Sequence, residues 1–250
     1  MDSVVPQISF LNLTIAFIPV FLVLAFFIHW SLGTQKIIFA LSRMLVQLLT
    51  IGYCLTFLFT TETHWVIIFV LLIMIFTASW ISLNEVPQQR KDLFFKALLA
   101  ISLGGGLTLA ITLFGVLQLS PWFQPQFIIP LSGMIFANAM NAISLAAERF
   151  TSELAHQQTY SQARNIAFGT ALIPITNSLL AVGLVSIPGM MSGQILSGIT
   201  PVIAARYQIM VMCMLFASAG LSTALFLTLC RFSTRQSDNI KVKQQNNDSQ

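Results

Sequence analysis

The chain has 250 residues, of which 56% are hydrophobic and only 8% are charged, and its formal net charge is +4. Soluble domains carry about 25% charged residues, so this composition excludes a soluble globular domain. Lys and Arg do not cluster among polar residues as they do on nucleic-acid-binding surfaces, so no nucleic-acid partner is expected. Most of the chain is therefore predicted to face the lipid bilayer or other helices within it.

Seven apolar stretches are long enough to cross the hydrocarbon core, which takes roughly 17–25 residues as a helix. In chain order they are Ile8–Trp30, Ile37–Phe59, Trp65–Leu83, Ala97–Leu117, Phe127–Ala147, Ala171–Ile187 and Tyr207–Cys230. Backbone groups in lipid must satisfy their own hydrogen bonds, which requires helices. We therefore predict an all-α fold, a polytopic transmembrane helix bundle of these seven spans.

The orientation of this bundle follows from its positive charges. Every Lys and Arg except Arg206 falls on one side of the seven-span arrangement. Because cytoplasmic loops are enriched in Lys and Arg, we predict that the N-terminus is outside and the C-terminus cytoplasmic. Residues 1–230 would form the transmembrane domain, and residues 231–250, rich in Gln, Asn and Ser, a disordered cytoplasmic tail.

The chain offers no set of residues typical of an enzyme. Its three cysteines, Cys54, Cys213 and Cys230, are widely spaced and indicate buried packing residues rather than a disulfide framework or zinc site. No nucleophile–base pair is apparent, so no catalytic residue and no cofactor are expected. A Gly-rich ATP-binding loop is also absent, so ATP could act only through another polypeptide. No acidic residue falls at a predicted membrane midplane, which argues against an ion-coupled carrier.

The segment Leu172–Gln208 is interrupted more often than any other part of the chain. The interrupting residues are Pro174, Pro188 and Pro201, with Gly183, Gly189, Gly193 and Gly198 between them. Proline removes helix hydrogen bonds, and broken backbone at membrane depth is tolerated only inside protein or beside a water-filled cavity. The segment is thus a candidate pathway or gate, or else an ordinary external loop with a helix cap. Ser186–Arg206 would re-enter the bilayer or lie on its outer surface.

Seven of the ten methionines lie in the second half of the chain. Thioether sulfur is a soft ligand that suits copper(I) and, less well, ferrous iron, but methionine is also a flexible packing residue. We expect packing for most of them. Met190 and Met191, which border the interrupted segment, are the candidate metal ligands.

Two further features fall inside predicted spans. Arg43 and Gln47 stand one turn apart, either as a buried polar pair or with Arg43 reaching the interface. Gly104, Gly105 and Gly106 indicate close helix packing.

Several motifs resemble the FetB-type family of iron-export ABC-transporter permeases, which is related to plant aluminium-tolerance membrane proteins. The resemblance extends from Arg43 to Leu229. It rests on Arg43-Met-Leu-Val-Gln-Leu with Gly52-Tyr53, on Ile129-Pro-Leu-Ser-Gly-Met with Asn138-Ala-Met, on Gly183-Leu-Val-Ser-Ile-Pro-Gly-Met-Met-Ser-Gly-Gln194, and on Tyr207-Gln-Ile-Met-Val. It implies a homodimeric permease in the cell inner membrane that pairs with a cytoplasmic ABC ATPase subunit and exports a metal ion, with iron the first candidate.

The resemblance also implies roles for particular residues. The translocation path would be lined by Asn138, Asn141, Asn177, Ser186, Pro188, Gly189, Met190, Met191 and Gln194. Coupling to the ATPase would involve Glu148, Arg149, Arg164 and Pro174. However, the stretch Glu148–Leu172 is short and lacks the Leu-Gly-Ala element of related permeases. Either Ser152–Phe168 forms a shortened coupling element, or the chain no longer couples to an ATPase.

Two alternative functions remain open at this point. The chain could be a permease for a nucleotide sugar or another organic solute, which the scarcity of carboxylate ligands for a hard cation favours. It could also be a non-transporting derivative that binds a partner after losing its coupling loop.

Overall fold

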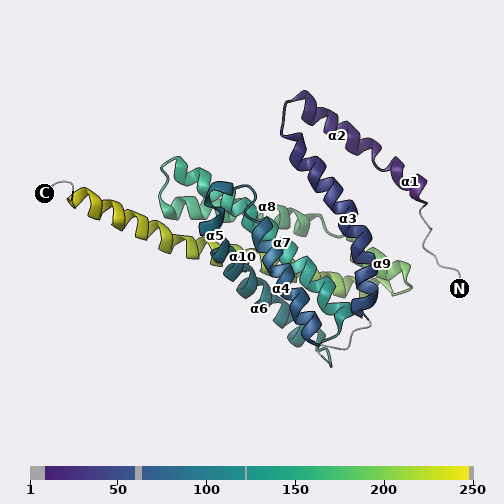
Figure 1. Cartoon of the computed structure of the whole chain (residues 1–250). Helices are drawn as coiled ribbons and strands as arrows, with labels where there is room; N and C mark the ends of the chain where they lie inside the picture. The colour runs from purple at the N-terminus through teal and green to yellow at the C-terminus, as the bar shows by residue number, and fades with distance from the viewer. Residues whose placement is uncertain (1–8, 60–63, 122, 248–250) are drawn as a thin grey trace. The chain divides into compact units, whose positions relative to one another are not determined.

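Helices make up nearly all of the computed structural model, which describes residues 9–59, 64–121 and 123–247 (Figure 1). In chain order the elements are α1 (Phe10–Ile15), α2 (Ile18–His29), α3 (Thr34–Phe59), α4 (His64–Ile81), η1 (Pro87–Gln89), α5 (Arg90–Ala100), η2 (Ile101–Gly105), α6 (Gly106–Ala110), η3 (Ile111–Leu117), α7 (Pro125–Ala155), α8 (Tyr160–Ala181), α9 (Gly189–Leu196) and α10 (Pro201–Asn247). Across these described ranges the only β-type pairing is an isolated bridge between Val182 and Ser186. The predicted all-α fold is confirmed.

The chain divides into two units. The first comprises Met1–Glu62 with Leu196–Gly198, and the second comprises Thr63–Ile195 with Ile199–Gln250. Within the described residues, α1, α2 and α3 belong to the first unit, and α4 through α8 with most of α9 and all of α10 belong to the second.

In the first unit, the predicted span Ile8–Trp30 is divided into two helices. Ser9 caps α1 by accepting a hydrogen bond from the Asn12 amide at 3.2 Å, and a turn at residues 16–17 separates α1 from α2. Pro19 explains the break, because it has no N–H to donate and its ring crowds the carbonyl of Ile15 four residues back. A short turn then leads from α2 back into α3.

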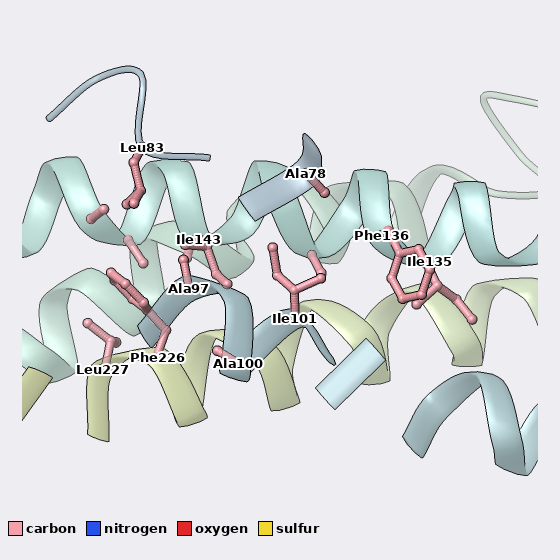
Figure 2. Close-up of a cluster of buried hydrophobic side chains, with 14 of the residues drawn as sticks. Ala78, Leu83, Ala97, Ala100, Ile101, Ile135, Phe136, Ile143, Phe226 and Leu227 are labelled. Atoms are coloured by element: carbon pink, nitrogen blue, oxygen red, sulfur yellow. The ribbon is translucent and has the colours of Figure 1, made fainter. Parts of the chain in front are cut away.

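The second unit is a helix bundle in which α7 packs against α4, α8 and α10. Figure 2 shows how its core is built where α5, α7 and α10 meet. Ala97 and Ala100 are fully buried beside Phe226 and Leu227 of α10. Helices in lipid associate through close packing, and small residues permit it because they let the backbones approach.

One continuous helical stretch runs from Arg90 to Leu117 and consists of α5, η2, α6 and η3. It contains two π-helical segments, Ile101–Gly105 and Ile111–Leu117. It approaches α10 closely at Gly104, where an added Cβ atom would lie only 2.7 Å from the backbone nitrogen of Ser222. Gly105 faces Phe136 and Ile135, whereas Gly106 faces open space. The prediction of close helix packing is therefore confirmed for the first two glycines and is wrong for Gly106.

Six helical segments in the described part of the chain are long and apolar enough to cross a membrane, where the sequence predicts seven. They are Leu11–His29, Thr34–Cys54, His64–Ile81, Pro87–Leu117, Pro125–Ala155 and Pro201–Arg231. The missing one is the predicted span Ala171–Ile187. The corresponding helix, α8, ends at Ala181 and begins at Tyr160, so its first half contains Ser161, Gln162, Arg164 and Asn165 and is too polar to qualify.

The interrupted segment is only partly as predicted. Pro174 lies inside α8, which continues through it to Ala181. The break comes after this helix, where Gly183 has a φ of +82°, a left-handed conformation that ends helices and that glycine adopts without strain. The Gly183 N–H donates to Ser186 O at 2.9 Å, α9 follows from Gly189, and α10 begins at Pro201.

The last helix differs from expectation at its C-terminal end. The sequence predicts a disordered tail from residue 231, but α10 continues in helical geometry to Asn247, and residues 248–250 lie outside the described ranges. Extending an existing helix adds one hydrogen bond per residue, and Arg, Lys and Gln are good helix formers.

Candidate functional site

A cavity of about 400 Å³ lies where α7, α8 and α10 meet the interrupted segment. Each element contributes one face at helical spacing: Met134 and Asn138 come from α7, and Ile175 and Ser178 from α8. The interrupted segment closes the cavity with Val182, Ser186, Pro188, Gly189 and Met190. The break in the helix therefore shapes this cavity, as a pathway candidate requires.

Gln208 supplies the cavity's most unusual polar group. The residue is only 5% exposed, and its side-chain oxygen Oε1 has no hydrogen-bond partner among the described residues. A buried amide oxygen without a partner costs about 1–3 kcal/mol of stability. Gln208 lines the cavity, but this oxygen is sealed from it, so a ligand in the cavity would reach the oxygen only after the Gln208 side chain rotates.

Asn138, by contrast, is engaged within the protein. Its Nδ2 donates to the carbonyl of Leu215 at 2.6 Å and to Ser218 Oγ at 3.3 Å. These bonds connect the middle of α7 to α10, where hydrogen bonds between helices stabilise packing in lipid. Asn138 therefore lines the cavity and also holds one of its walls in place.

The structure brings together five of the nine predicted path residues: Asn138, Ser186, Pro188, Gly189 and Met190 all line this cavity. The other four are outside its lining. Asn141 and Asn177 are exposed, and Met191 and Gln194 are partly buried. Asn177 turns away because α8 continues through Pro174, so the face toward the cavity carries Ser178 instead.

Gln208, Met134, Met212 and Ser178 were not predicted as path residues. A usable signal was the helical spacing of Gln208, Val211, Met212 and Leu215, at positions i, i+3, i+4 and i+7 on α10, which all line the cavity. The spacing marks one face of the helix, but sequence alone does not tell which neighbouring helix that face meets.

Methionines separate this cavity from a second one. Met134 and Met190 line both the first cavity and a neighbouring apolar cavity of about 280 Å³, which Leu117, Phe127 and Met210 also line. Of the two predicted metal ligands, the structure thus places Met190 between the cavities, whereas Met191 lines neither. Within the described residues no group of three or more His, Cys, Asp or Glu side chains could hold a metal ion.

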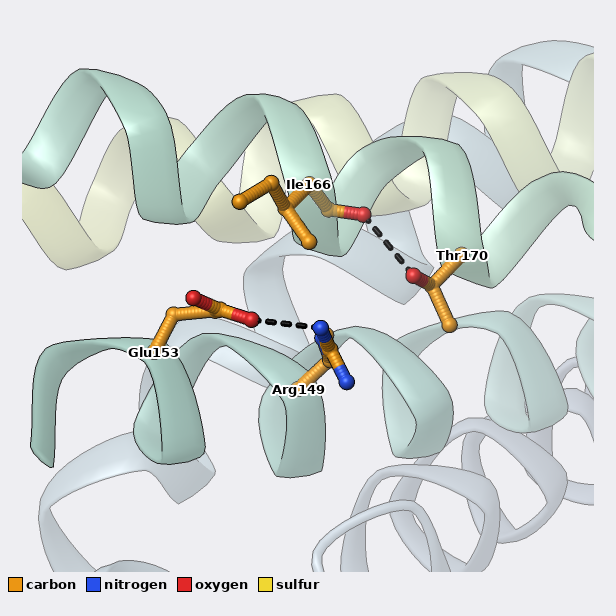
Figure 3. A network of polar contacts seen from close by, with 4 residues as sticks. All are labelled: Arg149, Glu153, Ile166 and Thr170. Carbon is orange, nitrogen blue, oxygen red and sulfur yellow. Dashed lines mark hydrogen bonds and ion pairs between the residues drawn. The ribbon is translucent and has the colours of Figure 1, made fainter. Parts of the chain in front are cut away.

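The predicted coupling residues do not form one cluster. Arg149 pairs with Glu153 at 2.6 Å, one turn further along α7, and the Glu153 side chain is only 10% exposed (Figure 3). Glu148 is exposed, and Pro174 lines the cavity rather than the α7–α8 turn. The residues Ser152–Phe168, predicted as a shortened coupling element, form the end of α7, a four-residue turn and the start of α8.

The start of α8 is fastened to its neighbours. Thr159 and Gln162 form a reciprocal capping box, in which each side chain accepts a hydrogen bond from the other residue's backbone N–H. The Tyr160 hydroxyl donates to Leu227 O of α10 at 2.8 Å, and the Arg164 guanidinium carbon lies 5.9 Å from the Tyr160 ring centroid. Specific side-chain contacts therefore hold the α7–α8 hairpin in place, although its turn is short.

Arg43 and Gln47 lie one turn apart on α3, and both side chains are exposed. The single chain does not bury them, so the prediction of a buried polar pair is not confirmed.

The sequence of the chain matches a family of known proteins. A model of an uncharacterised protein family, UPF0014, matches residues 10–164 and 155–234. The two matched parts overlap at residues 155–164, in the α7–α8 hairpin. No solved structure matches the chain.

Three relatives illustrate the range of the family. The chain is 37% identical to the probable iron export permease protein FetB of Escherichia coli, over 79% of this chain and 82% of the relative. It is 33% identical to a UPF0014 membrane protein of Synechocystis, over 76% and 79%. It is 28% identical to the ALUMINUM SENSITIVE 3 protein of Arabidopsis thaliana, over 78% and 76%. With its multiple apolar helices and a family match that covers most of its length, the chain belongs to the UPF0014 family of multi-pass membrane proteins.

Proposed function

We propose that this chain is the membrane permease subunit of an ABC transporter that exports a metal ion, with iron as the first candidate, across the inner membrane. The similarity to the FetB permease, at 37% identity over most of both chains, carries the proposal. The cavity at the interrupted helix supports it, because broken backbone at membrane depth is typical of substrate sites in transporters.

In this proposal the chain works as a homodimer with a separate cytoplasmic ATPase. The sequence contains no Gly-rich ATP-binding loop, so ATP would be hydrolysed by the partner. The tip of the α7–α8 hairpin, which carries exposed polar residues next to the Arg149–Glu153 pair, is the segment proposed to contact it. The N-terminus lies outside and the C-terminus in the cytoplasm, which puts this hairpin on the ATPase side.

A nucleotide sugar is a poorer cargo for this cavity. Its diphosphate is doubly negative, and such groups are bound in proteins by Arg, Lys or clustered backbone N–H groups. None of the described residues that line the cavity is a cation.

The test is ATP-driven transport in inverted membrane vesicles that contain this chain and its ATPase. We expect labelled iron to accumulate inside the vesicles with ATP and not with a non-hydrolysable analogue. Vesicles that contain the ATPase alone are the control. If ATP drives no metal accumulation, the export proposal is wrong. If the chain also fails to stimulate ATP hydrolysis, the non-transporting alternative, which the short hairpin favours, is the correct one.

A further inference from the structure

The cavity gathers soft and neutral donor atoms from three separate parts of the fold. Met134 comes from α7, Met190 from the start of α9 and Met212 from α10, and all three line the same cavity as Gln208. A methionine that only fills space in an apolar core does not need a polar side chain beside it. Here the thioethers share a cavity with Gln208, which is almost fully buried and whose amide oxygen is unpartnered among the described residues.

The charge of the cavity restricts what it can bind. No described residue in its lining carries an ionisable side chain. A trivalent or otherwise hard cation prefers anionic oxygen ligands, and burying it among neutral groups would leave its charge uncompensated. Thioether sulfur and amide oxygen are suited instead to soft or borderline cations of low charge.

Two of these methionines also line the neighbouring cavity. Met134 and Met190 line both cavities, so their side chains stand at the boundary between the polar cavity and the apolar one. The apolar cavity is bordered by Leu117 and Gln126, on either side of the η3–α7 connection, which the proposed topology puts outside the cell.

We propose that the cavity between α7, α8 and α10 is the cargo site, and that it binds a low-charge thiophilic metal cation through the sulfur atoms of Met134, Met190 and Met212. The Oε1 atom of Gln208 completes the site when its side chain rotates toward the ion. This deepens the proposed function and rests on it. The site takes reduced ions, copper(I) or iron(II), and excludes iron(III).

Metal binding by the purified full-length chain in nanodiscs tests the site. The probes are silver(I), as a redox-inert stand-in for copper(I), anaerobic iron(II), and iron(III) citrate. We expect silver(I) or iron(II) to bind, and the triple variant Met134→Leu, Met190→Leu, Met212→Leu to bind one ion fewer per chain. The number of bound ions per chain is compared between variants. Ions bound by the three cysteine thiols add equally to each number, so they do not affect the difference. Binding of silver(I) alone or of iron(II) as well tells which reduced ion the site prefers.

Met214→Leu is the matched control. Met214 is buried on α10 two residues after Met212, but it lines a different cavity with Thr108 and Thr112. Leucine fills nearly the same volume as methionine, so both changes preserve packing. Only the change at the first cavity should remove the bound ion.

Gln208→Leu separates a cargo ligand from a structural residue. A structural glutamine would lower the Tm of the metal-free chain when replaced. An unpartnered amide should instead leave the Tm equal or higher when it becomes apolar, while the affinity for the cation falls roughly 10- to 100-fold.

Three results would overturn the site: binding that is unchanged in the triple variant, a preference for iron(III), or a Tm loss in Gln208→Leu with unchanged affinity. The proposed function fails differently. If the wild-type vesicles transport iron and the triple variant transports it equally well, export stands and this site is wrong. If wild-type vesicles transport no metal, export itself is wrong.

Discussion

Among the glycines in the described residues, Gly104 is the one whose added Cβ atom would lie nearest to atoms of another helix. A Cβ atom there would lie 2.6 Å from Ser222 Oγ and 2.9 Å from Ser222 Cα. The hydroxyl could rotate away, but the backbone of α10 cannot, so the two helices would have to separate. Overpacking of this kind costs about 1–3 kcal/mol.

We therefore predict that Gly104→Ala destabilises the protein although alanine is the better helix former by about 1 kcal/mol. Because the clash involves backbone atoms, the upper part of the overpacking range applies, and the Tm measured in detergent should fall by a few degrees. Gly106→Ala is the control: nothing lies within 4 Å of its Cβ position, so its Tm should stay equal or rise. Equal behaviour of the two variants would contradict the close approach.

The sequence predicted the individual residues of the site less completely than it predicted the helices. Asn138 was predicted as a path residue, and the structure places it in the cavity lining and gives its amide a partner on α10. Gln208 was not found, because its importance lies in a missing partner, which depends on the three segments that surround it. A local pattern carries no information about such an absence.

At the scale of elements, the α7–α8 hairpin is stabilised by a capping box at the start of α8. The Thr159 and Gln162 side chains satisfy backbone N–H groups at the start of α8, which the helix itself leaves unpaired. Four residues connect α7 to α8, so the cap also fixes where the chain reverses direction.

We predict that Thr159→Ala lowers stability by about 0.5–2 kcal/mol, because the cap is lost, and reduces the ATP hydrolysis that the chain stimulates in its partner. Thr159→Ser keeps the hydroxyl and should retain both properties. The measurements are the Tm and the ATPase rate of the reconstituted complex. A lower Tm with full ATPase stimulation would show that the hairpin is not the coupling element.

Elements were predicted well where hydrophobic length alone decides, and poorly at their ends. Six of the seven spans predicted from the sequence coincide with apolar helices, because an uncharged stretch of this length has no alternative to a helix in lipid. The predicted span Ala171–Ile187 was wrong at both ends, because α8 begins at Tyr160 and ends at Ala181. Pro174 does not interrupt it, since helices tolerate proline when their neighbours satisfy the freed groups.

The number of membrane crossings is the main question for the whole molecule. Six segments qualify by length and composition within the part of the chain that the structure describes, and an even number would put both ends of the chain on one side. However, α8 follows α7 after a four-residue turn and packs along it. Its 22 residues span about 33 Å at 1.5 Å per residue, which matches a bilayer core of about 30 Å. If α7 crosses, α8 is long enough to return.

Cysteine labelling decides between six crossings and seven. In a background with Cys54, Cys213 and Cys230 replaced by alanine, His156→Cys at the α7–α8 turn should react only after the membrane is permeabilised, and Thr200→Cys, just before α10, should react in intact cells. That opposite pair requires α8 to cross, because it alone joins the two positions through the bilayer. Labelling of both only after permeabilisation would leave six crossings and move the C-terminus outside. The Arg-rich start of the tail would then face away from the cytoplasm, against the charge asymmetry of the whole chain.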